Sequence, residues 1–124
     1  MTARGTTSYS VDLHEEVAVV RARGELDSSS AASFRAALDR AVAAGLPLVV
    51  VDLEHATFLD SAGLAVVFSA QRRLGLQQRL ALGHVPDRML RTLRLAAVPS
   101  VVDCWPQGGE QPWLPVEAEI PPTP

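Results

Sequence analysis

Residues 58–64, Phe-Leu-Asp-Ser-Ala-Gly-Leu, hold the side chains best suited to chemistry in this 124-residue chain. Asp60 and Ser61 stand between an apolar run typical of a strand and a second apolar run typical of a helix. Either side chain can cap the free N–H groups at a helix start, and the same groups favour a phosphate. Phosphorylation of Ser61 would add about −1.5 to −2 charges beside Asp60. The junction therefore predicts a helix cap or, beyond that, a phosphorylation switch at Ser61.

A nucleophilic serine is another interpretation of this junction. The sharp turn of serine hydrolases needs Gly-x-Ser-x-Gly, but Leu59 stands at the position of the first glycine. The candidate bases are His14, His55 and His84, which are scattered along the chain and form no metal-ligand cluster. A glycine-rich phosphate loop is also absent from the sequence. We therefore expect no catalytic residue, no metal and no cofactor, and a protein that is not an enzyme.

A second aspartate, Asp27, ends an earlier apolar run as Asp60 ends the central one. If the two strands are parallel neighbours, both carboxylates lie at the same edge of the sheet. Paired carboxylates can bind a metal, run acid–base chemistry or simply cap helices. Three serines, residues 28–30, follow Asp27 and are candidates for a helix N-cap.

A stripe of small and polar residues continues from Ser61 along the expected helix. Ala65, Ser69 and Arg72 follow at i+4, i+8 and i+11, which places all four on one side. An ordinary exposed helix face and a surface for a partner protein both fit this pattern. On spacing alone, an ordinary exposed face is favoured over a partner surface.

Alternating strands and helices position these residues. The expected strands span residues 8–13, 17–23, 48–53, 79–82 and 100–104. The expected helices span residues 31–44 and 61–74, with a third opening at residues 86–87. A strand, a helix and a buried strand in succession imply parallel pairing and an α/β fold. The inward-facing helix positions are Phe34, Ala37, Leu38, Ala41, Val42, Leu64, Val67, Phe68, Met89, Leu90 and Leu93.

Charge and composition exclude several functional classes. Hydrophobic residues make up 48% and charged residues 20% of the chain, which is typical of one globular domain. No apolar run is long enough to cross a membrane and no signal peptide is visible, so we expect a cytoplasmic protein that binds no membrane. The 11 arginines before Pro106 are matched by 11 acidic residues, which argues against a nucleic-acid-binding face. The single cysteine, Cys104, excludes an intrachain disulfide and is expected to be a small core residue.

The last nineteen residues, 106–124, differ from the rest of the chain. They are rich in proline and contain Gly108-Gly109, a composition that cannot sustain a regular element. We expect one domain over residues 1–105 and an extended tail over 106–124. Trp113 and Leu114 are the tail residues able to dock, either on the body or on a partner. Three arginines on the third helix, Arg88, Arg91 and Arg94, form either a solvated face or a docking surface.

Three of these segments together resemble the signature of STAS domains and, more narrowly, of bacterial anti-sigma factor antagonists. They are Gly24-Glu25-Leu26-Asp27, Val49-Val50-Val51-Asp52-Leu53 and Phe58-Leu59-Asp60-Ser61-Ala62-Gly63-Leu64. The likeness covers about residues 17–102. It implies a small mixed sheet of four to five strands, with helices packed mainly on one face.

The resemblance also implies a mechanism of partner switching in transcription regulation. The unmodified protein would bind an anti-sigma factor that is also a serine kinase, and so release the sigma factor. The kinase would phosphorylate Ser61, the phosphorylated form would dissociate, and a PP2C-type phosphatase would reset it. Many members carry a second serine after the acceptor, whereas this chain has Ala62, so Ser61 is the acceptor that the resemblance indicates. Given this resemblance, we expect the stripe on the second helix and the loop at residues 27–30 to form the partner surface. The expected partner-binding residues are Asp27, Ser28, Ser29, Asp60, Ser61, Ala62, Gly63, Ala65, Ser69 and Arg72.

Two rival functions remain open at this point. A STAS scaffold subunit of a larger complex, of the stressosome or lipid-transport type, would share the fold without the switch. A small hydrolase using Ser61 would belong to a different class. The Asp-Ser junction favours the switch, and the missing glycine at Leu59 argues against the hydrolase.

Overall fold

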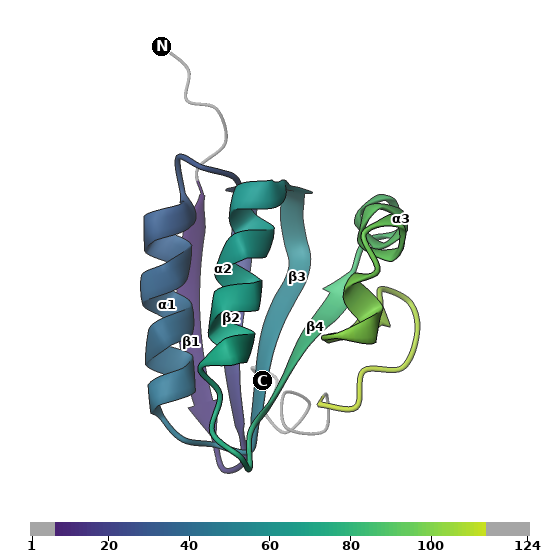
Figure 1. The fold of residues 1–124 in the computed structure, drawn as a ribbon. Coiled ribbons are helices and arrows are strands. Elements are labelled where there is room, and N and C mark those ends of the chain that lie inside the picture. The colour runs from purple at the N-terminus through teal and green to yellow at the C-terminus, as the bar shows by residue number, and fades with distance from the viewer. Residues whose placement is uncertain (1–6, 114–124) are drawn as a thin grey trace, which may run out of the picture.

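The described residues, 7–113, form a five-stranded mixed sheet, three α-helices and one short 3-10 helix in this computed structural model (Figure 1). The strands lie in the order β1-β2-β3-β4-β5 across the sheet. They are β1 (Ser8–His14), β2 (Val17–Leu26), β3 (Leu48–Leu59), β4 (Arg79–Val85) and β5 (Asp103–Pro106). The helices are α1 (Ala31–Ala43), α2 (Ser61–Arg72), α3 (Asp87–Leu95) and the 3-10 helix η1 (Val98–Ser100). This is the small mixed α/β fold that the sequence predicts.

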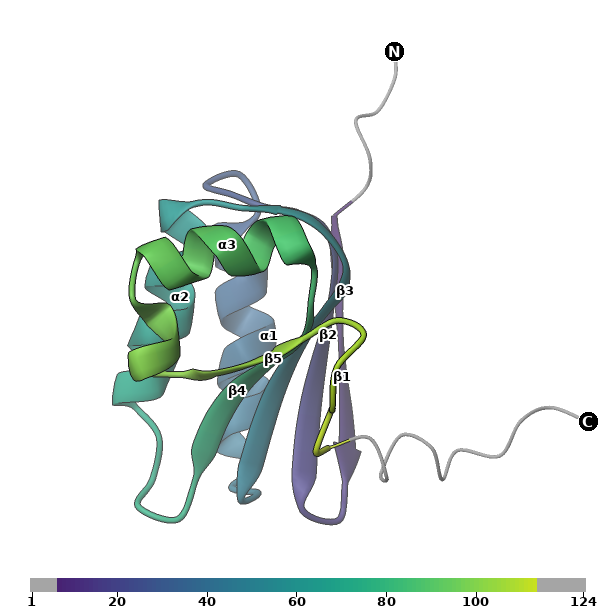
Figure 2. The same ribbon diagram turned by 90° about the vertical axis from the view of Figure 1, so that its right-hand side faces the viewer.

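The helices lie mainly on one side of the sheet. β1 pairs antiparallel with β2, while β2, β3, β4 and β5 are parallel neighbours joined through helices. Figure 1 shows α1 and α2 side by side over one face, with α3 beyond β4. Figure 2 views the sheet from the side of β4 and β5. The chain that follows β5 runs there on the side of the sheet away from α1 and α2, which we call the helix-free face. Within residues 7–113, none of the helices is long and apolar enough to span a membrane.

The core under the helices contains most of the positions expected from the sequence. Val49 and Val51 of β3 are fully buried there, as are Ala18 and Val20 of β2, because strands covered on both faces are apolar throughout. The predicted inward residues of α1 and α3 are buried, apart from Val42, which is partly buried against the core. The confirmed residues are Phe34, Ala37, Leu38, Ala41, Met89, Leu90 and Leu93.

Helix α2 corrects one expectation. Of Leu64, Val67 and Phe68, which the helical spacing places inward, only Val67 is fully buried, and the other two pack partly exposed against the core. The fully buried face of α2 consists of smaller residues, namely Gly63, Val66, Val67 and Ala70. Small side chains let this helix approach the strand ends closely, so size as well as polarity decides which face lies inward.

Strand β3 extends six residues beyond its predicted end at Leu53. Its pairing with β2 continues to Leu26 and Leu59, with one register shift where Arg21 and Arg23 pair with Asp52 and His55. A second shift lies between Gly24 and Glu25 of β2. Such bulges bend a strand and break its two-residue alternation. The polarity pattern of residues 54–59 therefore did not predict the strand that they form.

The last strand is also shifted from its predicted place. It begins at Asp103, whereas residues 98–100 form η1 and residues 101–102 a turn, because Pro99 favours a tight turn over a strand. Val98 and Val102 are buried and anchor this turn on the core. Cys104 is half-buried, and burial raises the pKa of its thiol to about 11. Its thiolate is therefore scarce at neutral pH, as expected of a packing residue.

The chain after β5 returns across the helix-free face. Trp113 is 1% exposed and packs on Val17, Val19 and Val50. A Cβ at Gly83 would lie 2.6 Å from the indole Nε1, so this glycine makes room for the ring. Of the two places expected for Trp113, the structure shows the body. Leu114 and the rest of the tail, 115–124, lie outside the described residues.

Candidate functional site

The candidate site lies where β2 and β3 end side by side. Leu26 and Leu59 are register partners, and the N–H of Asp60 donates to the carbonyl of Leu26 at 3.3 Å. Asp27 and Asp60 follow these residues directly, so both carboxylates lie at one edge of the sheet, as parallel pairing predicts. The chain then enters α1 and α2, whose N-termini lie at this same edge (Figure 1).

Asp60 is the residue that caps α2. Its Oδ1 accepts hydrogen bonds from the N–H groups of Ala62, at 2.8 Å, and Gly63, at 3.2 Å. Its backbone is extended, with φ −112° and ψ −168°, as in a regular N-cap. The sequence left the cap open between Asp60 and Ser61, and this geometry assigns it to Asp60.

Ser61 is therefore the first residue of the helix and has no capping role. It is exposed, and within residues 7–113 its hydroxyl makes no hydrogen bond. The N–H groups expected to receive a phosphate are already held by Asp60. A phosphate on Ser61 would thus lie close to a carboxylate that already holds these donors.

Gly63 determines how closely α2 approaches the strand ends. A Cβ at this position would lie 2.7 Å from the carbonyl oxygen of Leu26 and 2.6 Å from Cδ1 of Leu59. Because the carbonyl of Leu26 is part of the backbone, a side chain at position 63 would fit only if the helix moved away. Gly63 is one of the residues expected to bind a partner, but it is buried. Its role in the fold is to set how far the start of α2, and with it Ser61, lies from the strand ends.

The loop after β2 is fixed by hydrogen bonds of Asp27 and Ser30. The Oδ1 of Asp27 accepts from the N–H of Ser29 at 3.0 Å and from its hydroxyl at 2.7 Å. Ser30 is buried, and its hydroxyl donates to the carbonyl of Glu25 at 2.8 Å instead of capping α1. The Tyr9 hydroxyl donates to Ser30 Oγ at 3.0 Å, and burial raises the pKa of Tyr9. Ser28 and Ser29 are left exposed above this support.

Within the described residues, Ser69 is the member of the α2 stripe that is hydrogen-bonded to the neighbouring helix. Ser61, Ala65 and Arg72 are exposed, while Ser69 is half-buried and accepts a hydrogen bond from Arg35 of α1 at 3.1 Å. Asp39 of α1 pairs with Arg73 of α2. Arg35 and Asp39 thus both connect the two helices.

A charged cluster on the helix-free face was not identified from the sequence. Asp52, only 4% exposed, accepts from His84 Nδ1 at 3.0 Å and from Arg21 at 3.1 Å, and Arg21 also pairs with Asp12 at 3.0 Å. Asp52, His84 and Glu54 offer three possible metal-ligand atoms within 4.8 Å of one another. Asp52 Oδ1, however, also accepts from the N–H of Glu54 at 3.0 Å, so both of its oxygens are already satisfied. This cluster is explained as a structural ion-pair network.

The same cluster holds the chain after β5. The N–H of His84 donates to Gln111 Oε1 at 2.9 Å, and the imidazole meets Trp113 edge-on with 5.2 Å between ring centroids. Trp113 Nε1 also donates to Gln111 at 3.3 Å. An aspartate inside the apolar run at residues 49–53 was the signal for this network, since an aspartate is rarely buried without partners.

Comparisons with known proteins agree on one family. A family model described as "Mlab, STAS domain" matches residues 9–103. The anti-sigma-F factor antagonist RsfB of Mycobacterium tuberculosis is 30% identical over 98 residues, which cover 77% of this chain and 80% of that protein. An anti-sigma factor antagonist from Mycobacterium paratuberculosis has a TM-score of 0.77 at 25% identity, over 86% of this chain and 91% of that one. The Bacillus cell fate determinant SpoIIAA in its phosphorylated form shares the fold, with a TM-score of 0.60 at 22% identity over 78% of this chain and 90% of that one.

Proposed function

This chain belongs to the STAS domain family, and we propose that it acts as an anti-sigma factor antagonist whose binding is switched by phosphorylation of Ser61. In its unphosphorylated form it binds a serine-kinase anti-sigma factor and so frees the sigma factor for transcription. The similarity to anti-sigma factor antagonists over most of the chain supports this class of partner. The kinase phosphorylates Ser61 and releases the protein, and a PP2C-type phosphatase restores the binding form. In this account the protein is a substrate and a binding module, and no catalytic group of its own takes part.

The observation that carries the proposal is that Asp60, and not Ser61, caps α2. Asp60 caps α2, while the hydroxyl of Ser61 is exposed and uncommitted within the part of the chain that the structure describes. Modification of Ser61 therefore removes no hydrogen bond that holds the fold. It adds about −1.5 to −2 charges to an edge that already carries Asp27 and Asp60. A partner whose surface fits two carboxylates is repelled by the added charge, while the helix remains in place.

The proposed contact surface surrounds Ser61. It consists of the exposed serines after Asp27, the start of α2 and the stripe that continues to Arg72. Of the residues expected there, Gly63 contributes through the height of the helix, and Ser69 is shared with α1. The upper half, from Ser61 to Ala65, is the part free to enter a partner's active site.

The test begins with candidate kinase-type anti-sigma factors and ATP, with the phosphate mapped by mass spectrometry. Binding is then measured for Ser61→Ala and Ser61→Asp, with Ser10→Asp as a matched control. Ser10 is an exposed serine of β1, an edge strand away from the proposed surface. We expect phosphate on Ser61, binding by Ser61→Ala and Ser10→Asp, and weak binding by Ser61→Asp. Equal binding by Ser61→Asp and Ser61→Ala would instead indicate a scaffold subunit without a switch.

A further inference from the structure

The last part of β3 has a free edge. β3 pairs with β2 as far as Leu59, but its pairing with β4 ends at Asp52 and Gly83. Beyond that point, within the described residues, no strand pairs with the β4 side of β3. The two register shifts bend β3 here, and Figure 1 shows β4 diverging from it below α3. Unpaired backbone N–H and C=O groups on such an edge are a template for an added strand.

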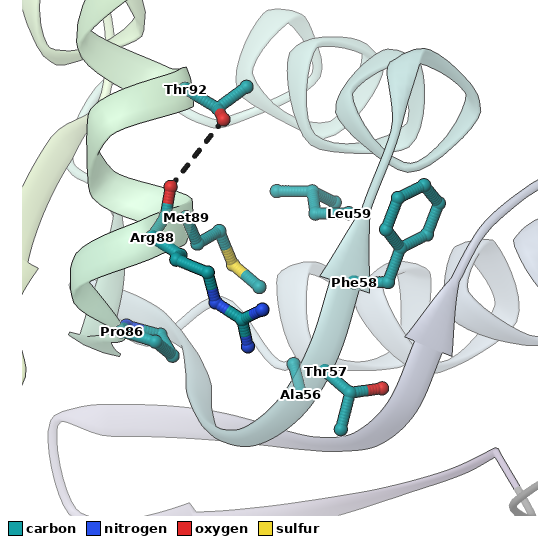
Figure 3. A pocket seen from close by; sticks show the side chains of 8 residues that line it. All are labelled: Ala56, Thr57, Phe58, Leu59, Pro86, Arg88, Met89 and Thr92. Atoms are coloured by element: carbon teal, nitrogen blue, oxygen red, sulfur yellow. Dashed lines mark hydrogen bonds between the residues drawn. The ribbon is translucent and has the colours of Figure 1, made fainter.

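Helix α3 forms the opposite wall of a groove along this edge. The groove has a volume of about 400 Å³. Its lining residues come from the end of β3 and from the start of α3, and they are Ala56, Thr57, Phe58, Leu59, Pro86, Arg88, Met89 and Thr92. Figure 3 shows Ala56 and Leu59 on the side of β3 that faces α3, and Thr57 and Phe58 on its other side. The guanidinium of Arg88 extends from α3 toward β3.

The lining has a distinct chemistry. Phe58 is 49% exposed, a large fraction for a phenylalanine, and Met89 and Leu59 add further apolar surface. Arg88 is the one charged residue among those that line the groove, and it is exposed. Across residues 7–113 it has no carboxylate within ion-pair distance. The groove thus combines a row of backbone groups, apolar side chains and one unpaired cation.

We propose that this groove binds an extended, acidic peptide segment of the partner protein, which adds as a strand along residues 54–59 of β3 and places a carboxylate against Arg88. Backbone hydrogen bonds to a sheet edge supply affinity in this mode, and side-chain pockets supply specificity. Leu59 lines the groove and Ser61 follows two residues later, so a strand bound here runs directly to the candidate acceptor. The identity of the partner rests on the proposed function, whereas the binding mode does not.

The test uses the full chain and the probe peptide acetyl-Glu-Val-Glu-Thr-Glu-Val-Glu-amide, followed by NMR of backbone amides. We expect shifts at residues 54–59 and 86–92. Arg88→Glu should weaken binding about fivefold to tenfold, and a peptide with lysine in place of glutamate should recover it on that variant. Arg91→Glu is the matched control, since Arg91 is an exposed arginine of the same helix that does not line this groove.

A peptide N-methylated at alternate residues separates strand addition from simple charge attraction. Because methylation removes the donors of one edge, we expect it to abolish binding. Equal binding of the methylated peptide, or shifts confined to α3, would overturn the proposal. Binding only to a chain ending at Trp113 would also overturn it, because the tail of this chain would then be the occupant. The two proposals can fail separately. If Arg88→Glu weakens peptide binding but Ser61→Asp does not weaken binding to the anti-sigma factor, the groove proposal stands and the proposed switch is contradicted.

Discussion

Two aspartates of the same chain segment, Asp52 and Asp60, have opposite uses. Asp52 is buried on the helix-free face and joins Arg21 and His84. Asp60 is half-buried at the strand ends and caps α2, which leaves the neighbouring Ser61 exposed. The network around Asp52 connects the strands with the chain that follows β5, while the region around Asp60 presents the hydroxyl of Ser61. The comparison indicates that the charged network and the proposed switch lie in separate parts of the molecule, so that one can change without the other.

Loss of Trp113 should give the largest effect and should be confined to stability. Trp113→Ala removes a ring that is 1% exposed, and we expect the free energy of unfolding to fall by about 3–5 kcal/mol. Urea denaturation measures this, with the half-buried Trp105→Ala as the control for loss of an indole. NMR shifts at Ser61 should stay unchanged, and movement there would show that the two regions are coupled.

Asp52→Ala tests the charged network itself. The substitution removes the carboxylate that His84 and Arg21 share, and we expect a loss of about 2–3 kcal/mol in the free energy of unfolding. The value lies below that of a fully buried pair because Arg21 is partly exposed. Glu15→Ala, at an exposed residue of the turn between β1 and β2, is the control. A loss below about 0.5 kcal/mol would mean that the network contributes nothing to stability.

Gly63→Ala tests how the strand ends position the switch. The added Cβ overlaps the carbonyl of Leu26, so α2 must shift, and we expect a cost of about 2 kcal/mol. Partner binding should weaken as well, since Ser61 moves with the helix. Gly75→Ala is the matched control, because a Cβ there meets only Gln78 at 3.5 Å. Unchanged binding by Gly63→Ala would contradict the view that the height of α2 matters.

Asp60→Ala should have the smallest effect on folding. Loss of the two capping hydrogen bonds should lower the free energy of unfolding by about 1 kcal/mol, and Asp60→Ser should recover most of it. Chemical denaturation distinguishes these values. An effect as large as that of Asp52→Ala would remove the contrast between the two aspartates.

The sequence predicted the geometry at the ends of β2 and β3 better than that of the helix-free face. Ser61 and its helix were recognisable because a strand-to-helix junction is a local pattern, and parallel pairing then aligned Asp27 with Asp60. The network around Asp52 combines residues from four strands, so it depends on register and not on local spacing. Trp113 follows a proline- and glycine-rich stretch without periodicity, and its burial depends on the space left by Gly83. The groove beside β3 could not be predicted for a similar reason. The two bulges break the alternation of polar and apolar residues, so the last part of the strand was not recognised.

The most direct measurement compares the protein phosphorylated at Ser61 with the unmodified protein in two assays. The first is affinity for a kinase-type anti-sigma factor, and the second is the free energy of unfolding. We predict that affinity falls about a hundredfold or more, while stability changes by less than about 0.5 kcal/mol. Unchanged affinity, or a loss of stability as large as that of Asp60→Ala, would contradict the claim that Ser61 switches binding without carrying the fold.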